Sequence, residues 1–202
     1  YMRQGEGDGD PFTNFLVARY SENFGKQNRV GAIVTTKSSP SNVATTGAVD
    51  AFIRFNDKLS FSGMGTMTQD SRNSKQGFAE YGQFLYKDNL VTLYWTHTLV
   101  SDQYNPAMGF VSRKNVLSNS QGIDLNIRGK WLPKFIRFWE PGLYTELYHS
   151  LTTGNIVEQH LISGPLWFNL QNGGIIGGYV EGAIQNLEEP FNPVGIRINP
   201  GR

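Results

Sequence analysis

Apolar and polar residues alternate along much of this chain with a period of two residues. The alternation is clearest in residues 123–131, where one set of positions holds Ile123, Leu125, Ile127 and Trp131 and the other holds Asp124, Asn126, Arg128 and Lys130. Successive side chains of a β-strand point to opposite faces, so this stretch predicts a strand with one apolar and one polar face. A helix would scatter both sets around its axis.

The same pattern predicts about ten strands of roughly 9–12 residues, longer than a common soluble strand and close to the length that crosses a membrane. In the stretch 49–55, Val49 and Ile53 fall on the apolar side, and Asp50 and Arg54 fall on the polar side. The expected strands are 14–23, 29–36, 49–55, 59–67, 77–86, 91–96, 123–131, 143–151, 156–163 and 176–185.

Short and long connections alternate between these strands, less regularly after Trp131. The short ones are Asn56 with Asp57, 87–89 and 171–174, and the long polar ones are 37–46, 70–76 and 101–121. Outer-membrane barrels have short turns at the periplasmic end and long loops at the external end. The sequence therefore predicts an all-β fold, an antiparallel transmembrane up-and-down β-barrel.

Composition fits this fold without deciding it. Charged residues are 17% and hydrophobic residues 39% of the 202 residues, both below the usual share for a soluble domain. Low values of both are expected when each strand shows one face to lipid and the other to a polar lumen. A soluble barrel or sandwich rich in Gly, Asn and Ser would look the same. No run of about 18 apolar residues occurs, so no transmembrane helix is predicted.

The barrel prediction divides the chain and assigns faces to its side chains. We expect residues 1–10 to form a flexible end or loop and residues 11–202 to form the barrel region. Aromatic residues near strand ends, among them Tyr94, Trp139 and Trp167, predict interfacial girdles, although core aromatics would give the same pattern. The lipid-facing residues are Val49, Ile53, Ile123, Leu125 and Ile127, and the lumen-facing residues are Asp50, Arg54, Asp124, Asn126, Arg128, Lys130 and Glu146.

No motif in the sequence indicates catalysis. His97, His149 and His160 form no metal-binding pattern, the chain has no cysteine, and no nucleotide or nucleophile motif occurs. Glu146, Glu158 and Glu181 are expected on polar strand faces with Arg or Lys partners, and nothing fixes two of them as a sugar-cleaving pair. We therefore predict no catalytic residue, no metal, no cofactor and no enzyme activity. A net charge of +1 without a basic patch predicts no nucleic-acid partner.

The long connection 101–121 is the expected external ligand or partner surface. Tyr104, Phe110 and Arg113 are its candidate contact residues, because aromatic rings stack on sugars. Packing of Tyr104 and Phe110 against the barrel wall is an equally weighted alternative.

Several stretches resemble a known family. They are 15–19, 25–35, 195–201 and above all 104–113, with the pattern YNPxxGFVxR. The chain resembles the large C-terminal region of an uncharacterised Bacteroidota-type envelope family, whose members carry a carbohydrate-binding-like domain followed by an outer-membrane barrel. The resemblance implies that these residues are part of a larger barrel, preceded by that domain and followed by further strands after Arg202. It implies no catalytic residue.

Together these observations predict an integral protein of the bacterial outer membrane. We expect it to pass or bind a solute or glycan, with outer-membrane lipid and an envelope protein complex as partners. The alternative is a soluble, secreted β-sandwich or barrel that binds carbohydrate. In that fold Ile123, Leu125 and Ile127 would be buried in a core instead of meeting lipid.

Overall fold

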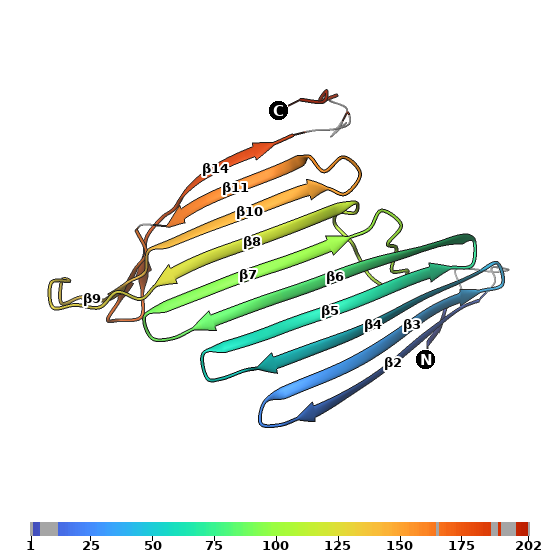
Figure 1. Cartoon of the computed structure of the whole chain (residues 1–202), viewed down its shortest axis with the longest axis horizontal. Coiled ribbons are helices and arrows are strands. Elements are labelled where there is room, and N and C mark those ends of the chain that lie inside the picture. The colour runs from blue at the N-terminus through green and yellow to red at the C-terminus, as the bar shows by residue number, and fades with distance from the viewer. Residues whose placement is uncertain (1, 5–11, 165, 187–189, 191–196, 202) are drawn as a thin grey trace. The chain divides into compact units, whose positions relative to one another are not determined.

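The structure is a computed structural model that describes residues 2–4, 12–164, 166–186, 190 and 197–201. It consists of antiparallel β-strands joined by turns, with no helix among the described residues (Figure 1). The described part of the chain accordingly has no helix with the length and apolar character needed to cross a membrane. The prediction of an all-β, antiparallel fold is confirmed.

The strands belong to two sheets. β9 (Ile136–Trp139), β12 (Phe168–Leu170) and β13 (Ile175–Ile176) form the smaller sheet. Among the described residues no pairing joins β1 to β14, so the larger sheet is not closed and the transmembrane barrel stays a prediction. The strands of the larger sheet, in hydrogen-bonded order, are β1 (Met2–Gln4), β2 (Thr13–Phe24), β3 (Asn28–Ser39), β4 (Asn42–Arg54), β5 (Leu59–Asp70), β6 (Asn73–Lys87), β7 (Val91–Val100), β8 (Val116–Leu125), β10 (Gly142–Ser150), β11 (Ile156–Gly164) and β14 (Val180–Gln185).

The chain divides into two compact units. The first comprises residues 1–83 and 97–117, and the second comprises residues 84–96 and 118–202. Of the expected flexible end 1–10, Met2–Gln4 form β1, which pairs with β2, and the rest lies outside the described residues. Residues 195 and 196 of the family-like stretch 195–201 also lie outside them.

In the first unit, the register of β2 to β5 sorts the side chains into two faces. β4 pairs with β3 from Phe52 opposite Arg29 to Asn42 opposite Ser39, and β5 continues the ladder without a bulge. Directly opposed residues of paired strands point to the same side of a sheet. The apolar face therefore carries Leu16, Tyr20, Val34, Val49, Ile53 and Met67, and the polar face carries Arg19, Thr35, Asp50, Arg54, Thr66 and Thr68.

Two of the three expected long loops are strands, so those predictions are wrong. β3 and β4 meet at a turn of Pro40 and Ser41, and β5 and β6 meet at Ser71 and Arg72. Thr45, within the expected loop 37–46, pairs with Thr36 in the ladder, because β-branched threonines suit a strand and can pair across it. The long connection after β7 is real but ends at Asn115.

In the second unit, β10, β11 and β14 pair successively, with one irregularity between Tyr148 and His149. The predicted strand 123–131 is wrong beyond Leu125. The Asn126 N–H turns to the carbonyl oxygen of Leu90 at 2.7 Å, and a turn from Gly129 to Leu132 follows. The predicted strand 176–185 is interrupted at Gly177 and Gly178, which separate β13 from β14.

The described residues contain almost no buried core. Ala44, Tyr104 and Val116 are the buried hydrophobic residues, and no large side chain is fully buried. Ile123, Leu125 and Ile127 are all half-buried. A soluble domain of this length ordinarily encloses a close-packed core in which a buried residue touches many others.

Candidate functional site

The polar face of the first unit carries a cross-strand ion pair. Arg19 Nη2 lies 2.9 Å from Asp50 Oδ2, and the pair passes over Gly31 on the strand between them. Farther along β4, Arg54 donates to Gln27, and its backbone N–H donates to Asn28 Oδ1 at 2.8 Å. The predicted lumen-facing residues Asp50 and Arg54 thus share this face.

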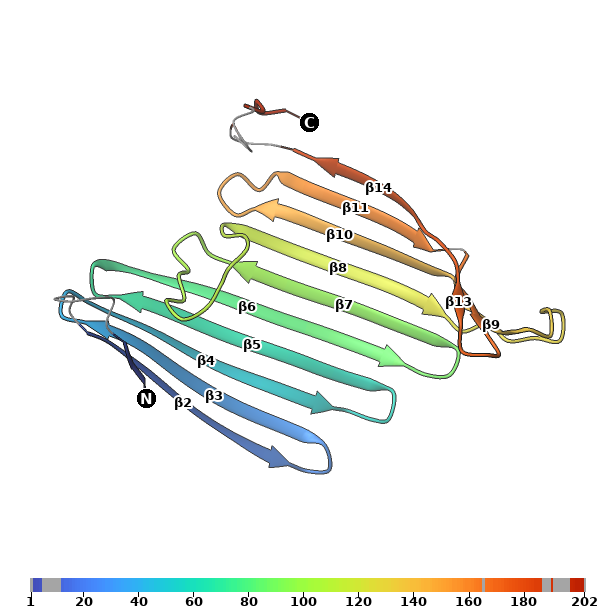
Figure 2. The ribbon, with the colours of Figure 1, turned by 180° about the vertical axis from the view of Figure 1, so that it is seen from behind.

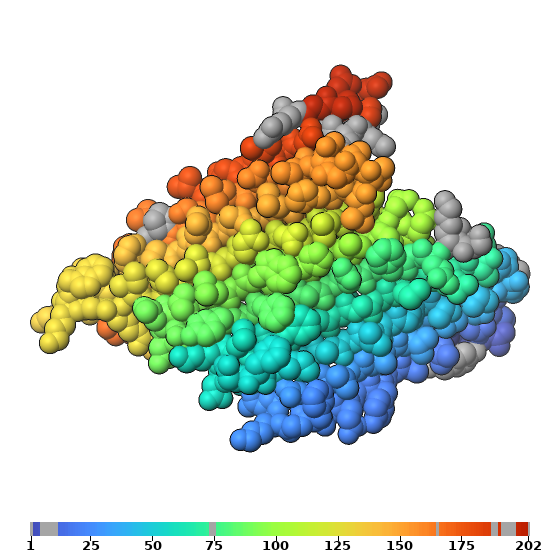
Figure 3. All heavy atoms as spheres, in the orientation of Figure 1, coloured from blue at the N-terminus to red at the C-terminus, as the bar shows by residue number. Residues whose placement is uncertain are grey.

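The opposite, apolar face of the first unit is exposed. Val49 is 63% exposed and Tyr20 69%, although both lie within long paired strands. Figure 3 shows this side, and no other described segment of the unit lies over β3, β4 and β5. The predicted lipid-facing residues Val49 and Ile53 lie on this face.

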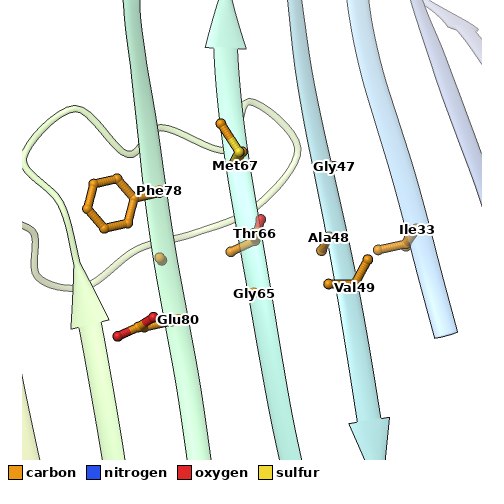
Figure 4. A pocket seen from close by; sticks show the side chains of 10 residues that line it. Ile33, Gly47, Ala48, Val49, Gly65, Thr66, Met67, Phe78 and Glu80 are labelled. Atoms are coloured by element: carbon orange, nitrogen blue, oxygen red, sulfur yellow. The ribbon is translucent and has the colours of Figure 1, made fainter. Parts of the chain in front are cut away.

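A shallow groove of about 570 Å³ crosses the apolar face where two glycines replace side chains. Gly47 and Gly65 form its floor, and Val49, Met67 and Phe78 surround it (Figure 4). Glu80 also lines the groove, and its carboxylate lies 3.3 Å from His97 Nε2. Among the described residues that line the groove, Glu80 is the only charged one.

The segment 101–115 packs on the polar face through Tyr104. Seen from behind, it crosses β6 (Figure 2). The Tyr104 hydroxyl lies 3.2 Å from Thr66 Oγ1, and the Asn105 N–H donates to Thr68 Oγ1 at 3.1 Å. Gly77 permits this approach, since a Cβ there would lie 2.3 Å from Tyr104 Cα. Tyr104 is therefore buried and does not share an open surface with the other predicted loop residues.

Phe110 and Arg113, the other two residues of the predicted ligand loop, are exposed. Phe110 is 89% exposed, the highest value among the exposed large hydrophobic residues. Tyr104 therefore packs the segment against the sheet, as one interpretation of the sequence expected, while Phe110 is exposed, as the other expected.

Tyrosines and carboxylates meet on the polar face of the second unit. The Tyr144 hydroxyl donates to Asp124, and the Tyr148 hydroxyl donates to Glu146 Oε1 at 2.7 Å. Ser120 also donates to Glu146 Oε1, at 3.1 Å. The predicted lumen-facing residues Asp124 and Glu146 therefore share one face.

His160 joins β11 to β14 between two carboxylates. Its Nε2 lies 2.6 Å from Glu158 Oε1, and its Nδ1 lies 2.7 Å from Glu181 Oε1. Because a carboxylate only accepts hydrogen bonds, this geometry fits a doubly protonated, cationic imidazole. The predicted sharing of a polar face by Glu158 and Glu181 is confirmed, but their partner is His160 instead of an Arg or Lys.

The two carboxylates contact opposite edges of the His160 ring and so do not converge on a common point. Within the described ranges, no group of three His, Cys, Asp or Glu side chains could hold a metal ion.

Glycines let aromatic rings lie directly on the strands of this face. The rings of Tyr94 and Tyr144 stack with centroids 6.0 Å apart, and both cover Gly122. A Cβ on Gly122 would lie 2.6 Å from each ring. Trp167 lies in the same way against Gly164 and Gly177. A Cβ on Gly164 would lie 2.6 Å from the Trp167 Nε1.

These rings help to form a pocket of about 410 Å³ in the second unit. Tyr144, Trp167 and Tyr179 supply three aromatic walls, and Glu181 supplies a carboxylate. The volume lies in the range of small-ligand sites, which combine apolar walls with a few polar groups. This aromatic pocket is the candidate functional site.

Sequence reasoning missed this pocket. The Gly177-Gly178 doublet is the one signal of it in the sequence, because glycines within a strand pattern predict a close approach of another part of the chain. The true neighbour of Gly177 is Trp167, and the sequence contains no local pattern that pairs the two residues.

The remaining predicted site residues lie beyond the end of β8. Arg128 stacks over Phe138, with its guanidinium carbon 5.3 Å from the ring centroid, and Lys130 lies in the following turn. Ile127 pairs with Trp139 in an isolated bridge, and Trp139 stacks on Phe168. Their predicted positions on a continuous strand are therefore wrong, since the chain turns before it reaches them.

No protein-family model, curated protein sequence or solved structure matches the chain. The family resemblance of 104–113 therefore stays a prediction.

Proposed function

We propose that this chain forms part of the wall of an integral outer-membrane β-barrel that binds or passes a polar solute of the glycan class. In this proposal the apolar strand faces meet lipid and the polar faces line the lumen. An envelope protein complex is the expected setting. The chain acts as a binding or passage protein, without catalysis.

The observation that carries the proposal is the exposed apolar face of the first unit. Monomeric soluble proteins rarely expose contiguous apolar patches beyond a few hundred square ångströms. Here Leu16, Val34 and Val49 lie on the same face of three neighbouring long strands, and all three are exposed. Lipid is the medium in which such a surface is stable.

Strand length and the limits of the apolar band add support. β2 to β5 have 12 or 13 residues, more than the roughly 9–11 that a tilted strand needs to cross a bilayer. Apart from Val43, the apolar face becomes polar toward the Pro40 and Ser71 turns, where it carries Thr36, Ser38, Thr45 and Gln69. This change from apolar to polar residues is expected where the ends of the strands extend beyond the membrane into water.

In this proposal the open strand edges are paired with further strands of a larger barrel. A strand edge in lipid leaves its backbone groups without hydrogen-bond partners, which bilayers do not tolerate. The outer edge of β14 has no paired strand in the described part of the chain. The proposal therefore places further strands beside it.

A soluble glycan-binding module is the second candidate. It is favoured by Glu80 and His97, because an ionisable pair on a lipid-facing surface is unusual. The aromatic pocket suits either candidate, since sugars stack on aromatic rings in both settings.

Fractionation of the native protein tests the proposal. We expect the protein to stay with outer membranes after a carbonate wash and to migrate differently on gels with and without boiling. Release into the soluble fraction, together with heat-independent migration, would overturn the membrane proposal and favour the soluble module.

A further inference from the structure

We propose that the aromatic pocket of Tyr144, Trp167, Tyr179 and Glu181 binds a cationic group of the ammonium class, carried by a small solute or a glycan. The inference deepens the proposed function and rests on it only in requiring that this polar face meets water.

The composition of the pocket favours a cation. The face of an aromatic ring carries negative charge density and attracts ammonium groups, and several rings around one space form a cage for them. Here three aromatic residues share a pocket of about 410 Å³ with the Glu181 carboxylate. Among the described residues, none that lines the pocket is basic. A neutral sugar would use the rings but would gain less from the carboxylate.

The charges of the surrounding strands point the same way. β7, β8, β10, β11 and β14 contain no Lys or Arg. Their polar face carries Asp124 and Glu146 in addition to Glu158 and Glu181, and His160 supplies one positive charge between the last two. Carboxylates in excess on one face attract cations and repel anions.

The pocket is also held in place before any ligand arrives. Trp167 lies against Gly164 and Gly177, whose missing side chains leave room for the indole. Tyr144 is fixed by its hydrogen bond to Asp124, and Glu181 by its contact with His160. Walls fixed in advance lower the entropy lost on binding.

The test compares two probes that differ by one atom. Choline carries a positively charged quaternary nitrogen. In its isostere a carbon atom replaces this nitrogen, so the molecule has the same shape but no charge. Both are titrated by calorimetry into the full chain, in a polyoxyethylene ether detergent that carries neither sugar nor ammonium. We expect choline to bind about tenfold more tightly than the isostere.

Matched variants locate the effect. Glu181→Gln should reduce the preference for choline, because only the cation–π attraction of the rings remains, and Trp167→Leu should weaken the binding of both probes. Glu158→Gln is the control, because Glu158 also contacts His160 but does not line the pocket. It should leave the preference largely intact.

Three results would overturn the inference: equal affinity for the two probes, no binding of either, or equal losses in Glu158→Gln and Glu181→Gln. Each can occur while the protein remains in the membrane, which leaves the proposed function standing. Choline binding by a protein that fractionates as soluble would instead overturn only the membrane proposal.

Discussion

Arg19 and Asp50 form an ion pair across an intervening strand. Arg19 is on β2 and Asp50 is on β4, and the pair passes over Gly31 of β3, which has no side chain to separate them. A Cβ on Gly31 would lie 2.9 Å from Asp50 Oδ2 and 3.1 Å from Arg19 Nη2. Three neighbouring strands are thereby linked on the polar face by one contact.

A double-mutant cycle of Arg19→Ala and Asp50→Ala measures this pair. We expect a coupling free energy below about 1 kcal/mol, because the Arg19 side chain is 44% exposed and water screens such pairs. The coupling should shrink further at high salt. Urea unfolding of each variant gives the free energies. Arg54→Ala combined with Asp50→Ala is the control and should be additive, since Arg54 donates to Gln27 instead. A coupling that salt leaves unchanged would contradict a solvated pair.

Gly122 is expected to be sensitive to the smallest added side chain. Gly122→Ala would place a methyl group within 2.6 Å of both the Tyr94 and the Tyr144 ring. Overpacking of this kind typically costs about 1–3 kcal/mol. The midpoint of heat-induced unfolding on gels should fall accordingly. Gly182→Ala in β14 is the matched control, because a Cβ there meets nothing within 4 Å, and an equal loss in both variants would contradict the steric explanation.

Strand faces could be predicted from sequence where the alternation is simple. Val49 and Asp50 are adjacent, differ in polarity, and lie on opposite faces in the register of β4. The boundaries could not be predicted in the same way. Thr45 was expected in a loop because the stretch 37–46 is polar, yet its hydroxyl oxygen lies 3.4 Å from that of Thr36 across a continuing ladder. A polar sequence alone does not distinguish a loop from a strand that carries polar side chains on both faces.

The end of β8 and the aromatic pocket could not be predicted from the sequence, because both depend on tertiary contacts. The alternation of residues 123–131 suits a strand, but the hydrogen bond from Asn126 to Leu90 ends β8 at Leu125. The pocket depends on Trp167 lying against Gly164 and Gly177, and the second of these is ten positions away in a different connection. Local periodicity carries no information about such contacts.

Gly77 is expected to control whether the segment 101–115 stays on the sheet. A Cβ at Gly77 would lie 2.3 Å from the Gln103 carbonyl oxygen and from Tyr104 Cα, so Gly77→Ala must displace backbone. We expect limited proteolysis within 101–115 to become much faster in this variant.

Two further variants separate the contacts of this segment. Tyr104→Phe removes only the hydroxyl contact with Thr66 and should cost about 1 kcal/mol, with a smaller rise in proteolysis. Phe110→Ser should leave proteolysis unchanged, because that ring is almost fully exposed. If Gly77→Ala were cleaved no faster than the unaltered protein, the close packing of Tyr104 on the sheet would be wrong.

Adjacent arginine substitutions in β3 test which face meets lipid. Val34 is on the apolar face beside Ala18 and Gly47, and Thr35 is on the polar face beside Val17 and Thr46. In a membrane barrel, Val34→Arg should lower the free energy of folding into lipid vesicles by about 2–4 kcal/mol, because a charge near the bilayer midplane is poorly solvated. Thr35→Arg should change it little. Urea titration in vesicles measures both.

Depth along the strand supplies the control for this experiment. Ser38 is on the same face as Val34 but lies next to the Pro40 turn, where the apolar band has ended. Ser38→Arg should cost only about 0–1 kcal/mol, since the penalty for a lipid-facing charge decreases toward the membrane surface. Equal losses from Val34→Arg and Thr35→Arg would contradict the assignment of faces. Equal losses from Val34→Arg and Ser38→Arg would contradict a bilayer around them, because only a bilayer makes the penalty depend on depth.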